Sequence, residues 1–143
     1  MANQLHPTAV LDKRKGMVIL EAGVYVGPGA VIVGPVHLRA GVQVHAGAVV
    51  GSPPQECSAT RVDWERSVVI GAGTVIREHA VINRGKVDGQ GTRIGEDCQI
   101  LAGAHISGDC VLGADVTIPT HGVVDSGCTL RAGSITSPSS NIT

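Results

Sequence analysis

The sequence contains almost no aromatic residues: among its 143 residues there is no phenylalanine, one tryptophan and one tyrosine. Large rings supply much of the buried area of ordinary globular cores. Aliphatic side chains must fill the interior here, and 20 glycines indicate many tight corners with positive φ. The composition therefore favours a narrow core rather than a thick globular one.

Several other features are missing, and each absence excludes a class of protein. No window shows the period of an amphipathic α-helix. No apolar run approaches the roughly 20 residues of a membrane span, and the N-terminus lacks the apolar segment of a signal peptide. The net charge is −1, and no basic run extends beyond residues 13–15. We therefore expect a cytoplasmic protein that binds neither nucleic acid nor an acidic membrane surface.

The sequence does contain an aliphatic residue at every sixth position through most of its length. These anchor residues are Leu20, Val26, Ile32, Leu38, Val44, Val50, Ile70, Ile76, Ile82, Ile94, Ile100, Ile106, Leu112, Ile118, Val124 and Leu130. A small or slim residue follows most anchors by four positions, and glycine often follows directly. A period of six fits no face of an α-helix but is the hexapeptide signature of a parallel β-helix. We predict an all-β solenoid of triangular coils.

The repeat also predicts how the coils stack. Three hexads make a coil of eighteen residues, and successive coils lie about 4.8 Å apart. In this register Ile94 stacks on Ile76, and Ile100 stacks on Ile82. Asp88 then falls on an anchor position, so we expect a loop to replace one strand there.

Two segments interrupt the repeat within one predicted domain, residues 1–136. The first, residues 51–67, contains two consecutive prolines and the only tryptophan. The second, residues 84–93, is rich in glycine and basic residues. Insertions in solenoids tend to lie on one binding face, and loops on a rigid scaffold often carry function. Residues 137–143 are expected to be a flexible tail.

Three of the four cysteines follow the repeat rather than a metal-binding or disulfide pattern. Cys98, Cys110 and Cys128 all occupy the small position four residues after an anchor, where a free cysteine behaves as a small apolar residue. Cys110 and Cys128 are one coil apart and should lie above one another as free thiols. Cys98 should lie on a different edge of the triangle.

A metal site is not expected. Zinc deserves consideration because some hexapeptide proteins bind it through three histidines at a subunit interface. The six histidines are His6, His37, His45, His79, His105 and His121. They show no close pair in the second half with a third histidine one or two coils earlier.

Short segments between and within the hexads resemble those of a known family. They are HPTAV (6–10), GSPPQE (51–56), TRV (60–62), IRE (76–78), INRG (82–85) and AHISGDC (104–110). In this order, and over about residues 6–130, the chain resembles the UDP-N-acetylglucosamine acyltransferases. The resemblance implies a left-handed parallel β-helix and a homotrimer with active sites between subunits.

The resemblance also implies a reaction. That family moves a hydroxyacyl chain from acyl carrier protein to a hydroxyl of a UDP-sugar, in the first acyl transfer of lipid A biosynthesis, without a metal or other cofactor. A sugar hydroxyl is a weak nucleophile at neutral pH, so a histidine acts as general base. A UDP-sugar and an acyl thioester, or acyl carrier protein itself, are thus the expected partners.

The chain departs from the family at its catalytic positions. Gly108 stands where the family's catalytic histidine is expected, and Ser126 and Gly127 stand where the family has a Gly-His pair. Asn83 replaces a further histidine. The family's C-terminal helical domain does not follow. These departures predict very slow transfer, and they suggest that Gly108→His would raise the rate.

The remaining residues supply candidates for each role. His105, which matches the family's substrate-contacting histidine and should point outward, and His121, a possible replacement base, are the catalytic candidates. The substrate-binding candidates are Gln55, Glu56, Asn83, Arg84, Gly85 and His105. The candidates for docking an acyl carrier protein are Arg77, Arg84, Lys86 and Arg93, and a solvated basic face is the alternative.

Two functions from different classes follow. The chain is either an acyltransferase-type protein with impaired or altered catalysis, or a non-catalytic trimeric binding or scaffold protein on the same fold. In both cases an apolar outer face should be buried in a trimer. The outward candidates for that face are Val75, Val81 and Leu101.

Overall fold

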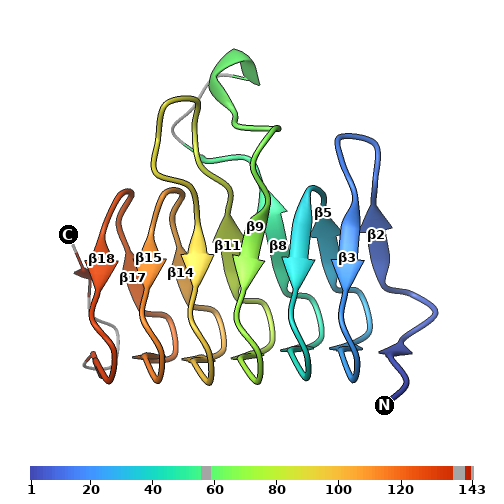
Figure 1. Ribbon diagram of the computed structural model, residues 1–143. Coiled ribbons are helices and arrows are strands. Elements are labelled where there is room, and N and C mark those ends of the chain that lie inside the picture. Colours follow the sequence, from blue (N-terminus) through green and yellow to red (C-terminus); the bar gives the residue numbers. More distant parts are fainter. Residues whose placement is uncertain (56–58, 137–140, 143) are drawn as a thin grey trace.

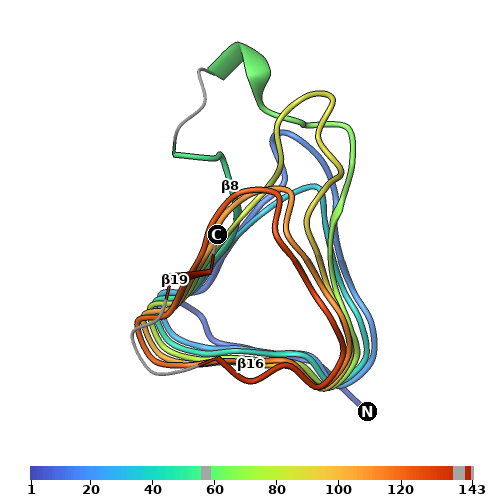
Figure 2. The ribbon, with the colours of Figure 1, turned by 90° about the vertical axis from the view of Figure 1, so that its left-hand side faces the viewer.

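The chain winds into a triangular solenoid whose coils stack along one axis (Figures 1 and 2). The computed structural model describes residues 1–55, 59–136 and 141–142. In these residues the strands form three sheets of six, seven and six strands, and every pairing between strands is parallel. Each sheet forms one side of the triangle.

The strands are short, as the hexads predict. The first sheet contains β1 (Gln4–Leu5), β4 (Tyr25–Val26), β7 (Gln43–Val44), β10 (Val75–Ile76), β13 (Gln99–Ile100) and β16 (Thr117–Ile118). The second contains β2 (Val10–Asp12), β5 (Val31–Val33), β8 (Val49–Ser52), β11 (Val81–Asn83), β14 (His105–Ile106), β17 (Val123–Val124) and β19 (Asn141–Ile142). The third contains β3 (Val18–Leu20), β6 (Val36–Leu38), β9 (Val68–Ile70), β12 (Arg93–Ile94), β15 (Val111–Leu112) and β18 (Thr129–Leu130).

Each position of the hexad has one structural role. From Val26 to Val124 the anchors are buried and stack into the core. The third residue after an anchor forms the corner of a regular turn with positive φ, and it is glycine, aspartate or histidine. These three residue types enter the left-handed region more readily than most others. The sequence thus specifies both the aliphatic core and the corners.

The predicted stacking is wrong across the second interruption. Ile94 pairs with Ile70, and Ile100 pairs with Ile76, rather than with Ile76 and Ile82. Residues 84–92 do not replace a strand, because they leave the prism as extra chain between β11 and β12. From Ile94 onward, successive coils keep the predicted spacing of eighteen residues.

The cysteines occupy the predicted places. Val111 pairs with Thr129, so Cys110 and Cys128, the residues just before them, lie in adjacent coils on the same edge. Cys98 precedes Gln99 on the first sheet, a different edge. Cys98, Cys110 and Cys128 are free thiols. Burial raises the pKa of the Cys110 thiol to about 12.

The long excursions leave the prism at one corner, between the second and third sheets (Figures 1 and 2). The first begins after Ser52, the end of β8, and includes the 3-10 helix η1 (Ala59–Arg61). The second begins after Asn83 and ends where Arg93 enters β12. Both are therefore slightly shorter than predicted.

Two residues of the predicted tail form a strand. Asn141–Ile142 form β19 and pair with β17, so these two residues extend the second sheet. The rest of the predicted tail, residues 137–140 and 143, lies outside the described residues. Within the described part of the chain, no helix has the length and apolar character needed to cross a membrane.

Candidate functional site at the corner of the excursions

The carboxyl ends of β8, β11 and β14 lie side by side at the corner from which the excursions leave. Ser52 ends β8, Asn83 ends β11, and His105 lies in β14. The INRG motif spans the last residues of β11 and the first residues of the second excursion. This corner therefore brings together residues of the GSPPQE, INRG and AHISGDC segments.

Arg84 is the buried centre of this corner, with 1% of its surface exposed. Its Nε donates to the Gly51 carbonyl at 2.7 Å. In the described structure its other four N–H groups also meet backbone carbonyls, those of Asp63, Arg66, Val33 and Pro35, at 2.7–3.3 Å. The guanidinium thus joins the strands to the first excursion. Burial lowers the pKa of Arg84 to about 10, while the nearby Asp63 carboxylate opposes that shift.

The first excursion folds over this guanidinium. The Trp64 ring lies 4.8 Å from the Arg84 guanidinium carbon and 5.5 Å from the Lys15 ammonium, within cation–π range of both. Asp63 is 7% exposed, and its carboxylate pairs with Arg66 Nε at 3.0 Å. The two excursions also pair directly, because the Asp63 N–H donates to the Gly85 carbonyl at 3.0 Å.

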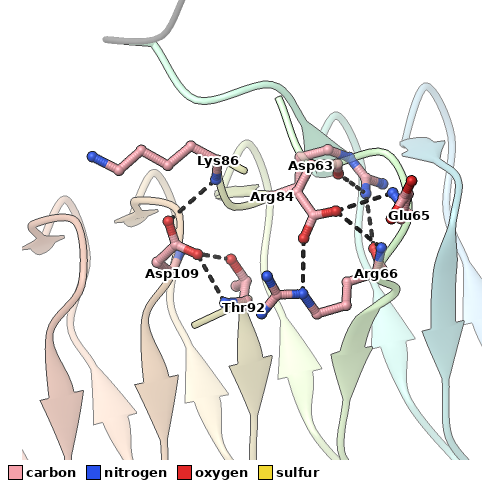
Figure 3. Close-up of polar contacts among 8 residues, drawn as sticks. Asp63, Glu65, Arg66, Arg84, Lys86, Thr92 and Asp109 are labelled. Atoms are coloured by element: carbon pink, nitrogen blue, oxygen red, sulfur yellow. Dashed lines mark hydrogen bonds and ion pairs between the residues drawn. The ribbon is translucent and has the colours of Figure 1, made fainter. Parts of the chain in front are cut away.

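Asp109 holds the second excursion in place (Figure 3). Its carboxylate accepts from the N–H groups of Lys86 at 3.2 Å and Gly91 at 2.8 Å. The Asp109 N–H donates to Thr92 Oγ1 at 2.9 Å, and that hydroxyl donates to the Asn83 carbonyl at 2.8 Å. A Cβ on Gly85 would overlap the Asp109 carboxylate, so this position requires glycine.

His105 lies at the end of a second polar chain. Its Nε2 is 2.7 Å from Asn83 Oδ1. Asn83 Nδ2 donates to Ser52 Oγ at 2.9 Å and approaches the Ser52 carbonyl at 3.5 Å. Asn83 is 2% exposed, whereas His105 is half-buried. Both residues were predicted to contact substrate, and the structure brings them into direct contact with each other.

The outer face of the second sheet around His105 is apolar. In the register of this sheet, His105 lies between Val81 and Val123. Val10, Val31 and Val49 continue the same row. Of the outward residues predicted to form an apolar face, only Val81 belongs to it. Val75 lies on the first sheet between Gln43 and Gln99, and Leu101 lies in a turn.

The other predicted site residues lie apart from this chain of contacts. Gln55 is exposed, and Glu56 lies outside the described residues. His121 forms a corner with φ of 59° and packs over Gly103, at the far end of the second-sheet strands from Asn83. Arg77 pairs with Glu78 at 3.1 Å. Lys86 and Arg93 are exposed, and the Lys86 side chain points away from Arg84 (Figure 3).

Two predictions need correction. Arg84 was expected to contact substrate or a carrier protein, but its enclosed side chain has all five donors directed at backbone carbonyls. Gly108→His was expected to restore a base. A Cβ at position 108 would overlap the Arg84 carbonyl and lie 3.2 Å from Gly85 Cα. The second excursion therefore occupies the space that a side chain at position 108 needs.

The sequence analysis missed Ser52, Asp63, Thr92 and the role of Asp109. Asp109 belongs to the AHISGDC segment, and Asp63 precedes the only tryptophan. Neither position in the sequence predicts the hydrogen-bond partners that these residues have in the fold. Among the described residues, no group of three or more histidine, cysteine, aspartate or glutamate side chains could hold a metal ion.

Sequence comparisons agree with the hexapeptide-repeat architecture. The family model of the bacterial transferase hexapeptide matches residues 91–126. The acyl-[acyl-carrier-protein]–UDP-N-acetylglucosamine O-acyltransferase of Syntrophobacter fumaroxidans is 36% identical over 131 residues, which covers 80% of this chain and 50% of that protein. The enzyme of the same name from Campylobacter lari is 34% identical and is covered over 49% of its length. The chain thus spans about half of these relatives.

Solved structures agree in fold. The LpxA structure from Acinetobacter baumannii superposes with a TM-score of 0.69 at 20% identity, covering 99% of this chain and 65% of that one. The UDP-N-acetylglucosamine acyltransferase from Campylobacter jejuni gives 0.58 at 23% identity, covering 94% and 68%. The fold is the left-handed parallel β-helix of hexapeptide-repeat proteins. Among them, the chain is a relative of the UDP-N-acetylglucosamine O-acyltransferases.

Proposed function

We propose that the chain is an acyltransferase-type protein that binds a UDP-linked sugar and an acyl thioester carried by acyl carrier protein. The observation that carries this proposal is the Ser52–Asn83–His105 chain, which lies within segments that resemble the named relatives. It presents an imidazole near the corner from which the two excursions leave. Lipid A biosynthesis in the cytoplasm is the corresponding process.

The chemistry requires removal of a proton from a sugar hydroxyl. The hydroxyl oxygen attacks the thioester carbonyl carbon, the C–S bond breaks, and the thiol leaves with a proton. Gly108 and Gly127 provide no base at the family's two positions. A histidine elsewhere must take that role, or transfer proceeds only through positioning of the substrates.

A cavity beside the second excursion supports binding of an anionic group. It has a volume of about 310 Å³ and is lined by Lys86, Gly89, Gln90, Asp109, Ser126 and Gly127. The Lys86 ammonium is an exposed cation at its edge, and the Asp109 carboxylate already accepts two backbone N–H groups. Lys86 is therefore suited to contact a diphosphate or a carrier phosphate, and Arg93 is a further exposed cation for docking the carrier protein.

The apolar outer face of the second sheet supports a homotrimer. A row of valines interrupted by His105 on one outer face is the kind of apolar patch that marks an interface. Burying this face against a second copy would bring His105 to the border between subunits. The candidate site would then lie between chains rather than within one.

A non-catalytic binding or scaffold protein is the second candidate. It is supported by Gly108 and Gly127, two glycines at positions where the family resemblance predicts histidine. The buried network around Arg84 would then serve only to hold the excursions in shape.

One experiment distinguishes the two functions. The protein is incubated with UDP-N-acetylglucosamine and hydroxyacyl-loaded acyl carrier protein, binding is measured by calorimetry, and product is detected by mass spectrometry. Binding with product supports the transferase. Binding without product supports the binding protein, and absence of binding to both partners contradicts the transferase.

A further inference from the structure

Hydrogen bonds to Asn83 define which nitrogen of His105 carries a proton. The Asn83 amide nitrogen can only donate, and it lies against Ser52 Oγ at 2.9 Å and the Ser52 carbonyl at 3.5 Å. The Ser52 carbonyl can only accept, so the amide nitrogen belongs on the Ser52 side and the amide oxygen faces His105 Nε2, at 2.7 Å. An amide oxygen only accepts, so Nε2 must donate. The neutral imidazole then has its proton on Nε2 and a free lone pair on Nδ1.

The surroundings keep this arrangement rigid. The Asn83 side chain is buried, and its own carbonyl accepts from Thr92 Oγ1 at 2.8 Å. The next residue, Arg84, is fixed by its five carbonyl contacts. A turned amide would place its oxygen against the Ser52 carbonyl, and two acceptors cannot form a hydrogen bond. In the described structure Nδ1 has no hydrogen-bond partner.

Within the described residues, the two strand neighbours of the imidazole carry no charge. Val81 and Val123 flank His105 in the sheet, and neither can compete for its proton.

We infer that His105 is the general base of this chain, acting through Nδ1, and that Asn83 is the positioning residue that keeps Nε2 protonated. The inference rests on the proposed function. Nδ1 takes the proton of the acceptor hydroxyl as its oxygen bonds to the thioester carbon. When the C–S bond breaks, the imidazolium returns that proton to the leaving thiolate. No cofactor is consumed, and the base is regenerated.

The assignment has a direct spectroscopic test. In the ¹⁵N NMR spectrum of the labelled protein at neutral pH, His105 should show a protonated Nε2 and an unprotonated Nδ1. Asn83→Leu removes the acceptor at nearly equal volume and should mix the two tautomers. Asn83→Asp keeps an acceptor and should retain the Nε2–H form. Protonated Nδ1 in the wild-type protein overturns the inference, whatever the activity.

Kinetics with hydroxyacyl-loaded carrier protein test the catalytic part. His105→Ala should lower kcat by about 10²–10⁴-fold, the usual contribution of a general base. Asn83→Leu should lower kcat by a smaller factor with little change in KM. Asn83→Asp should recover part of that loss and move the acidic limb of the kcat profile to higher pH, because a carboxylate stabilises the imidazolium.

His121→Ala tests the alternative assignment, since His121 is the other candidate base and lies at the opposite end of the strands. It should lower kcat far less than His105→Ala does. Transfer that survives His105→Ala but not His121→Ala overturns the inference and leaves the proposed function standing. A wild-type protein that binds both substrates but makes no product contradicts the catalytic inference and the transferase proposal together. Unfolding curves for each variant show whether it is folded, so that a loss of activity can be distinguished from a loss of folding.

Discussion

The guanidinium carbon of Arg84 lies 4.8 Å from the centre of the Trp64 ring, so one buried side chain supports the first excursion from beneath. The same guanidinium bonds to carbonyls of strands and excursion alike. Arg84 is preceded by Asn83, which orients His105. Stability of the corner and geometry of the candidate base therefore depend on two neighbouring residues.

Arg84→Ala should lower the free energy of unfolding by about 3–5 kcal/mol. Several buried carbonyls lose their donors at once, and each unsatisfied buried group costs about 1–3 kcal/mol, although entering water can recover part of this. Arg84→Lys should rescue little, because an ammonium has three donors rather than five in a planar fork. Urea unfolding measures both.

Arg77→Ala is the control for charge alone. Arg77 is exposed, and its ion-pair partner among the described residues is its neighbour Glu78, so its loss should change stability by less than about 1 kcal/mol. An equal effect of the two alanine substitutions would contradict the structural role of Arg84.

Gly108→Ala should destabilise the protein by about 1–3 kcal/mol, because a Cβ there overlaps the backbone of the second excursion. Gly108→His should do so at least as strongly and should not increase transfer. Gly127→Asp is the control, since nothing lies within 4 Å of its Cβ position and aspartate occupies the equivalent corner at Asp109. Thermal unfolding measures the stability of the three variants. A Gly108→His protein as stable as wild type would contradict the overlap.

The sequence predicts the solenoid well because each coil repeats the same local rule. The stacking predicted across residues 84–93 is wrong, and the error has a physical reason. Ile82 and Ile94 are two hexads apart, so the six-residue period continues unbroken through Asp88. Periodicity cannot distinguish a hexad that forms a strand from one that leaves the prism. Only the pairing of Ile94 with Ile70 separates the two.

In the candidate site, too, some residues could be predicted from the sequence and others could not. Asn83 and His105 could be selected from their motif, because strand alternation and resemblance both point to them. The role of Arg84 could not be predicted, since its acceptors come from segments as distant as Val33 and Arg66. An arginine in a basic loop looks like a ligand contact in sequence. Burial becomes visible only when the excursion folds back over it.

Stability should fall as the pH rises above about 9, partly because of Cys110. Burial raises its pKa from 9.0 to about 12, so the folded state keeps a proton that the unfolded chain releases. This contribution is complete below pH 9 and is lost progressively up to about pH 12. Cys110→Ala should show a smaller loss of stability between pH 8 and pH 10.5, measured by urea unfolding. An unchanged pH dependence would exclude Cys110 as a source.

The trimer proposal predicts different effects for two valines six residues apart. Val75 and Val81 both point outward and are half-buried, but Val75 has glutamine neighbours on the first sheet. Val81 lies in the row of Val49, His105 and Val123 on the second sheet. Val81→Lys would place a charge in the proposed interface, where an unpaired buried charge is strongly unfavourable. Sedimentation velocity at micromolar concentration should therefore show a trimer for wild type and Val75→Lys, and smaller species for Val81→Lys. A wild-type monomer, or dissociation by Val75→Lys alone, would show that the second sheet is not the interface.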